Sequence, residues 1–343
     1  MGSVKDLTVI EPATPNQMGR GRFFFSDRYS VFDWGEMPDQ IPHKGESIAL
    51  LGAYFFERLE DMGIPTHYLG LIEDDEPKRL EQLQGPSAIM EVQLLNVIEP
   101  GVRDDGYDYT DFKEAHGCFL IPLEIIYRNF LPEGSSVFKR LERGELTPDN
   151  LGLERMPAPG QKLDPPVLDV STKLEITDRY LSWDEARRIA ALSNSELGGV
   201  KELTTTVNDY ISRDFAKVGL TNEDGKIELG FDPERRLILV DVLGTLDECR
   251  FTYEGLPVSK EIARIWYRGT QWFKDTEEAK KRDRNFWKDI CRSKPEPLPP
   301  QLMKLISQIY CACTNEVTGR EWFPGTPPLK ETLEEIKSFL KQA

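Results

Sequence analysis

The segment 226–243 carries the pattern that most restricts how this chain can fold. Two apolar runs, 226–231 and 237–243, flank the sequence Asp-Pro-Glu-Arg at 232–235. The proline at this place fixes φ at a value that suits a tight turn. The segment therefore predicts an antiparallel β-hairpin.

The side chains of this hairpin suggest chemistry. A four-residue turn would pair Phe231 with Arg236 and would place Lys226 opposite Asp241. Glu228 would point from the same face, because side chains alternate along a strand. A lysine and two carboxylates on one face suit Mg²⁺ shared with nucleotide phosphates, since this ion takes one or two carboxylates and completes its shell with phosphate oxygens and water. A solvated cross-strand ion pair is the alternative, and a one-residue change of register would separate the three side chains.

The other segments indicate an α+β fold, with antiparallel strands first, then a helical pair, the hairpin and further helices. The apolar spacing separates strand-like runs from helical ones. Strands are expected at 2–10 and 22–33, as two strands of one sheet, and at 88–98 and 118–127. Helices are expected over 48–62, 183–194 and 198–217, with Ser182 as the cap of the second.

Clusters of proline, glycine and polar residues indicate the positions of loops and of the boundaries between lobes. Clustered prolines and a glycine predict an irregular loop at 156–166, and the polar stretch 99–117 looks like an exposed insertion. The final third of the chain is expected to be mostly helical. We expect an N-terminal lobe over 1–98, a second lobe over 118–270 and a helical extension over 271–343.

Composition excludes several classes of function. The net charge of −16 argues against nucleic-acid or anionic-membrane partners. No run approaches the ~18 apolar residues of a membrane span and no signal peptide is recognisable, so we expect a cytoplasmic protein. Neither a P-loop nor a dinucleotide-binding fingerprint is present. The scattered cysteines and few histidines disfavour disulfides and zinc, and Cys249, His43 and His67 are expected to be structural.

A candidate phosphate site follows the apolar run 120–127. Arg128 and Asn129 end this run, and Gly134-Ser135-Ser136 comes after a short loop. Arginine forks, the free N–H groups of a glycine-containing turn and serine hydroxyls suit a phosphate monoester. An ordinary strand-to-helix turn is equally compatible with this pattern.

A series of short segments occurs in a definite order along the chain. They are GSVKDL (2–7), SDRYSVFD (26–33), IPHKG (41–45), YRN (127–129) with GS (134–135), STKLE (171–175), KIELG (226–230), LVD (239–241), DECRF (247–251), and SK (259–260) with Arg264. Together, and in this order, they resemble the motifs of the SAICAR synthetase (phosphoribosylaminoimidazole-succinocarboxamide synthase) family.

The resemblance implies an N-terminal antiparallel-sheet lobe and a larger mixed α/β lobe with an ATP cleft between them, plus extra C-terminal helices. It implies ligation of carboxyaminoimidazole ribonucleotide to L-aspartate through an acyl phosphate, with ATP and Mg²⁺. Small molecules are the implied partners, and a homo-oligomer stays open. The implied roles are catalysis for Lys173 and Lys226, ATP binding for Lys5, Lys44, Glu228 and Asp241, metal binding for Glu228 and Asp241, and substrate binding for Arg128, Ser135, Glu175, Arg250, Lys260 and Arg264.

Some positions depart from the family's motifs. Val242, Leu246 and Ile265 stand where the family has Glu, Pro and Asp, and the stretches 99–117 and 270–343 have no counterpart. These departures leave two alternatives open. One is a paralogue with the same chemistry on another acid or amine, and the other is a non-catalytic, nucleotide-sensing relative. The retained lysine and carboxylates of the hairpin count against the second.

Overall fold

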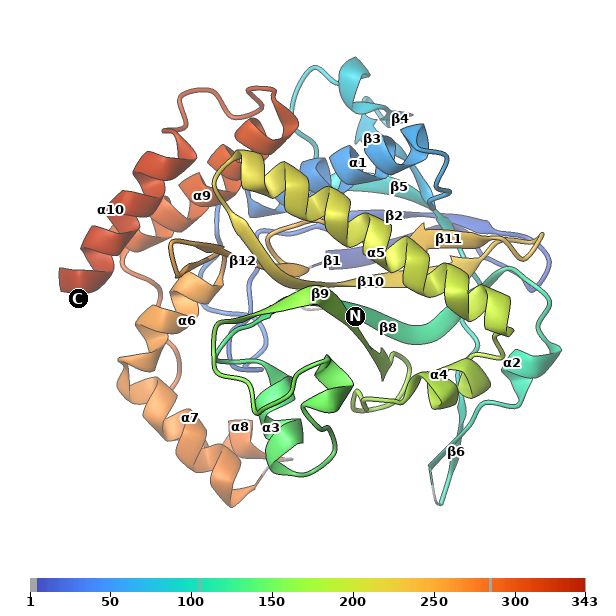
Figure 1. Cartoon of the computed structure of the whole chain (residues 1–343). Coiled ribbons are helices and arrows are strands. Elements are labelled where there is room, and N and C mark those ends of the chain that lie inside the picture. Colours follow the sequence, from blue (N-terminus) through green and yellow to red (C-terminus); the bar gives the residue numbers. More distant parts are fainter. Residues whose placement is uncertain (1–4, 105, 284–285, 343) are drawn as a thin grey trace.

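The computed structural model describes residues 5–104, 106–283 and 286–342, and it contains two large antiparallel sheets with helices packed against them (Figure 1). The first sheet has the strand order β1-β2-β5-β3-β4. Its strands are β1 (Lys5–Glu11), β2 (Gly19–Phe25), β3 (Tyr68–Glu73), β4 (Glu76–Lys78) and β5 (Ile89–Leu94). The predicted sharing of one sheet by the first two runs is confirmed, since Lys5 pairs with Phe25.

Helix α1 (Lys44–Asp61) packs on this first sheet through β2, β3 and β5. Its apolar residues recur at helical spacing, and Ile48, Leu51 and Phe55 are all buried. The helix begins four residues earlier than predicted. Gly45 permits this start, because a Cβ at this position would lie 2.2 Å from the carbonyl oxygen of Phe25.

The second sheet has the order β13-β12-β10-β8-β9, and β11 pairs with β10. Its strands are β8 (Phe119–Leu131), β9 (Gln161–Thr172), β10 (Thr221–Phe231), β11 (Leu237–Val240), β12 (Cys249–Tyr253) and β13 (Leu256–Val258). Helix α5 (Asn194–Lys217) crosses one face of it, as Figure 1 shows, and Phe215 stacks on Phe251 at a ring distance of 3.8 Å. Single bridges at Thr66–Leu239 and Asn96–Phe119 join the two sheets.

The predicted loop at 156–166 is wrong in its second half, because β9 already begins at Gln161. Pro165 and Pro166 fit this strand for two reasons. The strand lies at the edge of its sheet, where one row of N–H groups needs no partner, and its pairing with β8 is interrupted between Lys162 and Val167. The prolines therefore occupy a bulge.

The predicted register of the 226–243 hairpin is also wrong. Phe231 pairs with Leu237, not with Arg236. The Asp232 N–H donates to the carbonyl of Arg236 at 3.0 Å and the Asp232 carboxylate accepts from the Arg236 N–H at 2.7 Å, so the loop has three residues rather than four. Arg235 takes the left-handed conformation, with φ 60°, that such a loop needs.

This register removes the predicted cross-strand pair of Lys226 and Asp241. Glu228 lies opposite Val240. Asp241 follows the end of β11 in a left-handed conformation with φ 64°. Lys226 lies outside the part of β10 that pairs with β11, and its partner on the neighbouring strand β8 is Ile126.

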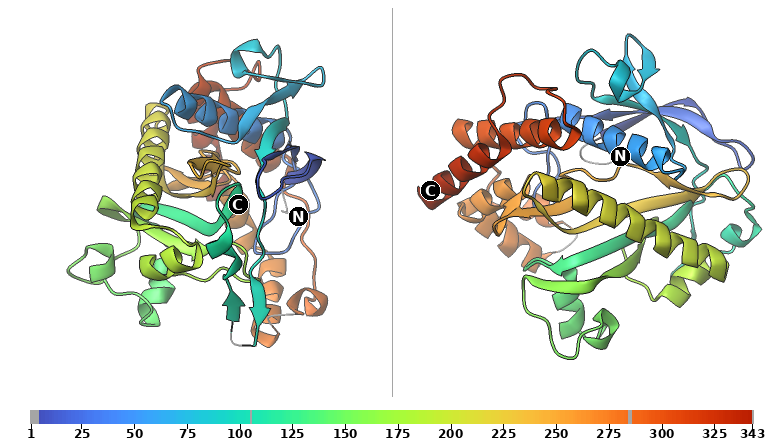
Figure 2. Two further views of the ribbon diagram at one scale, coloured as in Figure 1. Left: turned by 90° about the vertical axis from the view of Figure 1, so that its right-hand side faces the viewer. Right: turned by 45° about the horizontal axis from the view of Figure 1, so that its top comes forward.

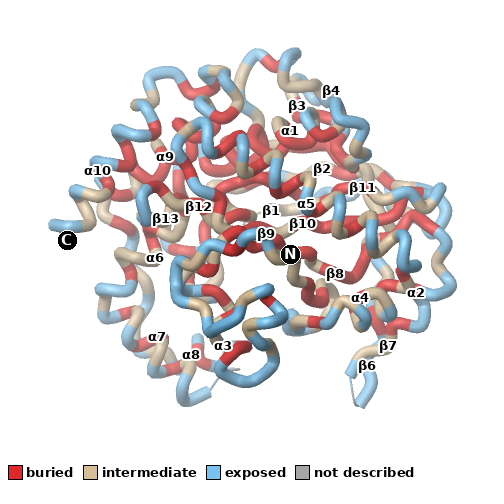
Figure 3. The backbone as a smooth tube through the Cα atoms, viewed as in Figure 1, coloured by how far each residue is buried: buried red, intermediate tan, exposed pale blue. Residues whose placement is uncertain are grey.

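The stretch 99–117 is only partly an exposed insertion. It forms a hairpin of β6 (Gly101–Arg103) and β7 (Gly106–Asp108), followed by α2 (Asp111–Glu114). Strand β6 is exposed, as Figure 3 shows, whereas Phe112 is buried and contacts the ring of Phe119. The stretch therefore anchors itself in the core of the second sheet.

The final third is helical, as predicted, and it lies beside both sheets (Figures 1 and 2). Its helices are α6 (Glu261–Arg268), α7 (Gln271–Arg282), α8 (Trp287–Ile290), α9 (Pro300–Thr318) and α10 (Leu329–Gln342). Helix α9 packs on α1, and α10 packs on α9. The lobe boundaries at 98, 118 and 270 stay a prediction.

Short elements complete the fold. They are the 3₁₀ turns η1 (Leu80–Gln82) and η2 (Asp149–Leu151) and the helices α3 (Ser136–Glu142) and α4 (Trp183–Ile189). Ser182 caps α4 as the sequence predicts, because its hydroxyl accepts from the N–H of Glu185. Among the described residues, no helix is long and apolar enough to cross a membrane.

Candidate functional site

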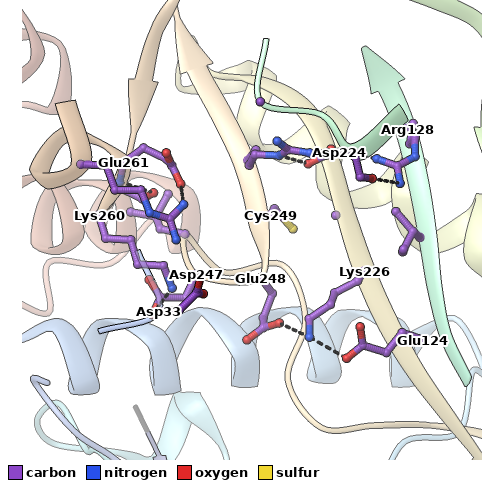
Figure 4. A pocket seen from close by; sticks show the side chains of 18 of the residues that line it. Asp33, Glu124, Arg128, Asp224, Lys226, Asp247, Glu248, Cys249, Lys260 and Glu261 are labelled. Carbon is purple, nitrogen blue, oxygen red and sulfur yellow. Dashed lines mark hydrogen bonds and ion pairs between the residues drawn. The ribbon is translucent and has the colours of Figure 1, made fainter. Parts of the chain in front are cut away.

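Two pockets lie near β10. The larger, of about 640 Å³, is lined mainly by polar and charged side chains from β8, β10, the start of β12 and helix α6 (Figure 4). We call it the polar cleft. The smaller, of about 350 Å³, has walls that include Leu7, Val9, Phe23 and Leu94, with Glu228 and Asp241 also among its lining residues. We call it the apolar pocket.

A chain of alternating charges connects the two pockets. Lys226 Nζ lies 2.9 Å from Glu124 Oε1, and Lys173 Nζ lies 3.0 Å from the same oxygen. Lys173 Nζ also lies 2.5 Å from Glu228 Oε1. Glu124 and Lys226 line the polar cleft, whereas Glu228 lines the apolar pocket. Strand pairing explains the cluster, because Glu228 of β10 faces Glu124 of β8 directly.

These charges hold one another in the ionised state. Burial raises the pKa of Glu124, but the Lys226 and Lys173 ammonium groups outweigh it and keep this pKa below its ordinary value. Burial lowers the pKa of Lys226, but the Glu248 and Glu124 carboxylates raise it above the usual range. Figure 4 shows Lys226 between these two carboxylates. The cluster therefore presents the fixed ammonium charge of Lys226 to the polar cleft.

The carboxylate of Asp241 lies in the apolar pocket and is ion-paired with Lys5. Burial lowers the pKa of the Lys5 ammonium to about 8, although the Glu248 and Glu228 carboxylates act in the opposite direction. Asp241 is also held through its backbone, because its carbonyl lies 2.9 Å from His67 Nε2. Burial, helped by the Lys5 charge, lowers the pKa of His67 to about 3, so its ring is neutral and donates from Nε2.

The polar cleft also contains a buried arginine site. Arg128 is 2% exposed and lies 3.0 Å from Asp169 and 3.6 Å from Asp224. Arg250 donates to Asp224 through Nε at 2.7 Å. Figure 4 shows Arg128 and Asp224 side by side on neighbouring strands. The Ser136 hydroxyl also lines the cleft, so arginine donors and a hydroxyl meet there as a phosphate monoester requires.

Other residues singled out in the sequence lie in different settings. Ser135 is buried and caps α3, accepting a hydrogen bond from the Val137 N–H. Glu175 accepts from the Tyr109 hydroxyl at 2.9 Å and lines neither the polar cleft nor the apolar pocket. Lys44 is completely buried, with Nζ 3.0 Å from Asp247. These three residues line neither the polar cleft nor the apolar pocket, and the roles that the resemblance implies for them stay predictions.

The helical side of the cleft is also basic. Lys260 and Arg264 both line it, with Lys260 Nζ 3.5 Å from Asp247 and Arg264 ion-paired with Glu261. Lys280 of α7 lines the same side and donates to the carbonyl of Phe32 at 2.8 Å.

Sequence reasoning gave no role to Glu124, Asp224 or Tyr180, although all three line the polar cleft. Glu124 left a usable signal, because it is the only charge in the apolar run 120–127. Asp224 and Tyr180 left none, since their relevance depends on the pairing of distant strands. Within the described residues, no group of three or more His, Cys, Asp or Glu side chains could hold a metal ion.

Comparisons with known proteins identify the family of the chain. The SAICAR synthetase family model matches residues 13–282. A protein of Archaeoglobus fulgidus, provisionally named a phosphoribosylaminoimidazole-succinocarboxamide synthase, is 48% identical over 342 residues, which cover 99% of this chain and 100% of that protein.

Solved structures share the fold. The SAICAR synthase of Saccharomyces cerevisiae, complexed with SAICAR, has a TM-score of 0.63 at 19% identity, covering 94% of each chain. A type-2 SAICAR synthetase in complex with ADP has a TM-score of 0.55 at 22% identity, covering 87% of this chain and 99% of that one.

The family match and the A. fulgidus relative define the class of protein as an ATP-dependent ligase that forms a carbon–nitrogen bond. The chain belongs to the SAICAR synthetase family, whose members catalyse an ATP-dependent ligation in purine biosynthesis.

Proposed function

We propose that this chain joins carboxyaminoimidazole ribonucleotide to L-aspartate in the cytoplasm, with ATP converted to ADP and phosphate. A ribonucleotide carboxylate oxygen attacks the γ-phosphorus of ATP and ADP leaves. The aspartate amine then attacks the acyl carbon, phosphate leaves and the amine proton is released. Support comes from the A. fulgidus relative and from neighbours that bind ADP and SAICAR.

The charge chain that joins the two pockets carries this proposal. The apolar walls of the smaller pocket suit an adenine ring, and the arginine end of the polar cleft suits a ribose phosphate. Between them, Lys226 and Lys173 would neutralise charge on the transferring phosphoryl group. Phosphoryl transfer depends mainly on such positioning and neutralisation, so little else is required of the protein.

Glu228 and Asp241 would hold Mg²⁺. Both are carboxylates that line the apolar pocket, and each is now paired with a lysine, Lys173 and Lys5 respectively. Two hard oxygen donors fit this ion, which takes its remaining ligands from phosphate and water. When bound, the ion would neutralise phosphate charge and orient the nucleotide.

Two of the residues that depart from the family's motifs differ in whether they line the polar cleft. Val242 is buried and packs on α1, because a Cβ at Gly52 would lie 2.6 Å from Val242 Cγ2. Leu246, by contrast, lines the polar cleft. A change of acid or amine would therefore involve Leu246 rather than Val242.

ADP release tests the proposal. The purified protein is supplied with MgATP, L-aspartate and carboxyaminoimidazole ribonucleotide, and each is omitted in turn. ADP and a succinocarboxamide product should form only when all three are present. ADP formation with another acid or amine would favour a paralogue, and nucleotide binding without turnover of any combination would favour a sensor.

A further inference from the structure

Helix α9 supplies one buried polar side chain, Tyr310, that contacts a residue of the polar cleft. The Tyr310 hydroxyl donates to Asp247 Oδ1 at 2.7 Å, across 63 residues of sequence. Tyr310 is fully buried, and Asp247 lines the cleft from the segment before β12. Burial, with the Asp247 carboxylate, raises the pKa of Tyr310 well above its ordinary value, so the hydroxyl keeps the proton that it donates.

Asp247 is the centre of a small charged network. Its Oδ2 lies 3.0 Å from Lys44 Nζ and 3.5 Å from Lys260 Nζ. Neither Oδ2 nor Lys44 Nζ makes a well-directed hydrogen bond to any described residue. Tyr310 is thus the one directed donor to this carboxylate in the described part of the chain, and the lysines act on it by charge.

Lys260 is the member of this network that is most exposed to the polar cleft. Its side chain is 19% exposed and lines the cleft, whereas the side chains of Lys44 and Asp247 are 0% and 3% exposed. The position of the Lys260 ammonium therefore depends on where the Asp247 carboxylate is held. Arg264 and Arg268 line the same side of the cleft, so this side as a whole suits an anion.

We propose that Tyr310 is a positioning residue that fixes the Asp247 carboxylate, which in turn holds Lys260 against an anionic group of the substrate in the polar cleft. This inference rests on the proposed function and deepens it. The family model ends at residue 282, so Tyr310 lies outside the segment that defines the family. The C-terminal helices would then complete the substrate site rather than only cover the core.

Loss of the hydroxyl has a definite physical consequence. A buried carboxylate that loses its directed donor is free to turn toward its remaining charged neighbours, and Lys44 is the nearer one. Asp247 would move away from Lys260, and the Lys260 ammonium would lose its anchor. Nucleotide binding should be spared, because none of these residues lines the apolar pocket.

The test compares Tyr310→Phe with Ser307→Ala. Ser307 is a matched control on the same helix, since its buried hydroxyl donates to the Pro42 carbonyl at 2.7 Å and lines neither pocket. We expect Tyr310→Phe to raise the KM for the ribonucleotide or for aspartate about ten-fold and to leave the KM for ATP unchanged. Ser307→Ala should change neither KM, even where both variants lose similar thermal stability.

A double-mutant cycle tests whether Tyr310 acts through Lys260. Tyr310→Phe should add little to the KM increase of Lys260→Met, because both remove the same contact. Full additivity, or an equal rise in the KM for all three substrates, would contradict the positioning role. If Tyr310→Phe does not fold, Asp247→Asn should give the same selective increase, and its absence would overturn the inference.

The two proposals fail differently. A wild-type protein that turns over no ribonucleotide with aspartate contradicts the proposed function. A wild-type protein that does so, together with a Tyr310→Phe variant of unchanged KM, contradicts only the positioning role.

Discussion

Lys173 Nζ lies 2.5 Å from Glu228 Oε1. The carboxylate that we propose as a metal ligand is therefore paired with the ammonium group of the residue that follows β9. The pair links the apolar pocket to the Glu124–Lys226 pair of the polar cleft. We propose that Lys173 would turn from Glu228 toward the nucleotide phosphates when Glu228 holds a metal ion.

Lys173→Met should therefore lower turnover by about 10²–10³-fold, because the substitution removes a positive charge that would stabilise the transferring phosphoryl group. The KM for ATP should change little. Lys162→Met is the control, since this lysine is exposed on β9, the strand that ends just before Lys173. Initial rates at saturating substrate measure the effect, and a wild-type kcat would remove Lys173 from the reaction.

Asp241→Asn should abolish Mg²⁺-dependent turnover while changing thermal stability little, because the side chain keeps its shape and remains partly solvated. A chelator added to the wild type should have the same effect on turnover, and excess Mg²⁺ should reverse it. Glu234→Gln, in the exposed loop of the same hairpin, is the control. Turnover of Asp241→Asn at the wild-type rate would exclude this carboxylate from the metal site.

Arg250→Ala should raise the KM for the ribonucleotide more than that for ATP. Loss of a charge-assisted phosphate contact costs about 2–4 kcal/mol, and Asp224 also loses its closest partner. The exposed Arg143→Ala serves for comparison. Equal increases in both KM values would argue against a phosphate site here.

Replacement of Ser135 should affect stability, whereas replacement of the adjacent Ser136 should affect substrate binding. Ser135→Ala removes the cap of α3 and should cost about 1 kcal/mol of unfolding free energy with little change in KM. Ser136→Ala removes a hydroxyl that lines the cleft beside Tyr180 and should raise the KM for the ribonucleotide at unchanged stability. Denaturant unfolding and steady-state kinetics on both variants decide this, and a KM effect of Ser135→Ala alone would reverse our assignment.

Cys249 should behave as a buried thiol and not as a nucleophile. Burial raises its pKa from 9.0 to about 12, so the unfolded chain ionises first as pH rises. Its contribution to stability is complete below pH 9 and is lost as pH rises from there toward 12. Between pH 9 and 10 the wild type should lose about 1 kcal/mol more unfolding free energy than Cys249→Ala. Equal alkaline slopes for the two proteins would contradict this.

Local patterns in the sequence were enough to predict many elements of the fold. The caps and apolar spacing of α4 and α5 are properties of neighbouring residues, because a helix forms its hydrogen bonds within about four positions. Pairing of the first two strands followed in the same way from two nearby runs. The prolines at 165 and 166 led to a wrong prediction of a loop. A strand can contain proline at the edge of a sheet, and the position of β9 at an edge depends on its pairing with distant strands.

The sequence by itself determined the kinds of side chain available for chemistry and the order in which they occur, since the motif segments are contiguous. The tertiary structure alone decided which of them meet. Arg235 in a left-handed conformation sets the register that parts Lys226 from Asp241, and strand pairing brings Glu124 to Glu228. Tyr310 reaches Asp247 only because α9 packs on α1. Such contacts depend on the packing of elements that are distant in the sequence and on the burial of charged side chains. A local sequence pattern encodes neither.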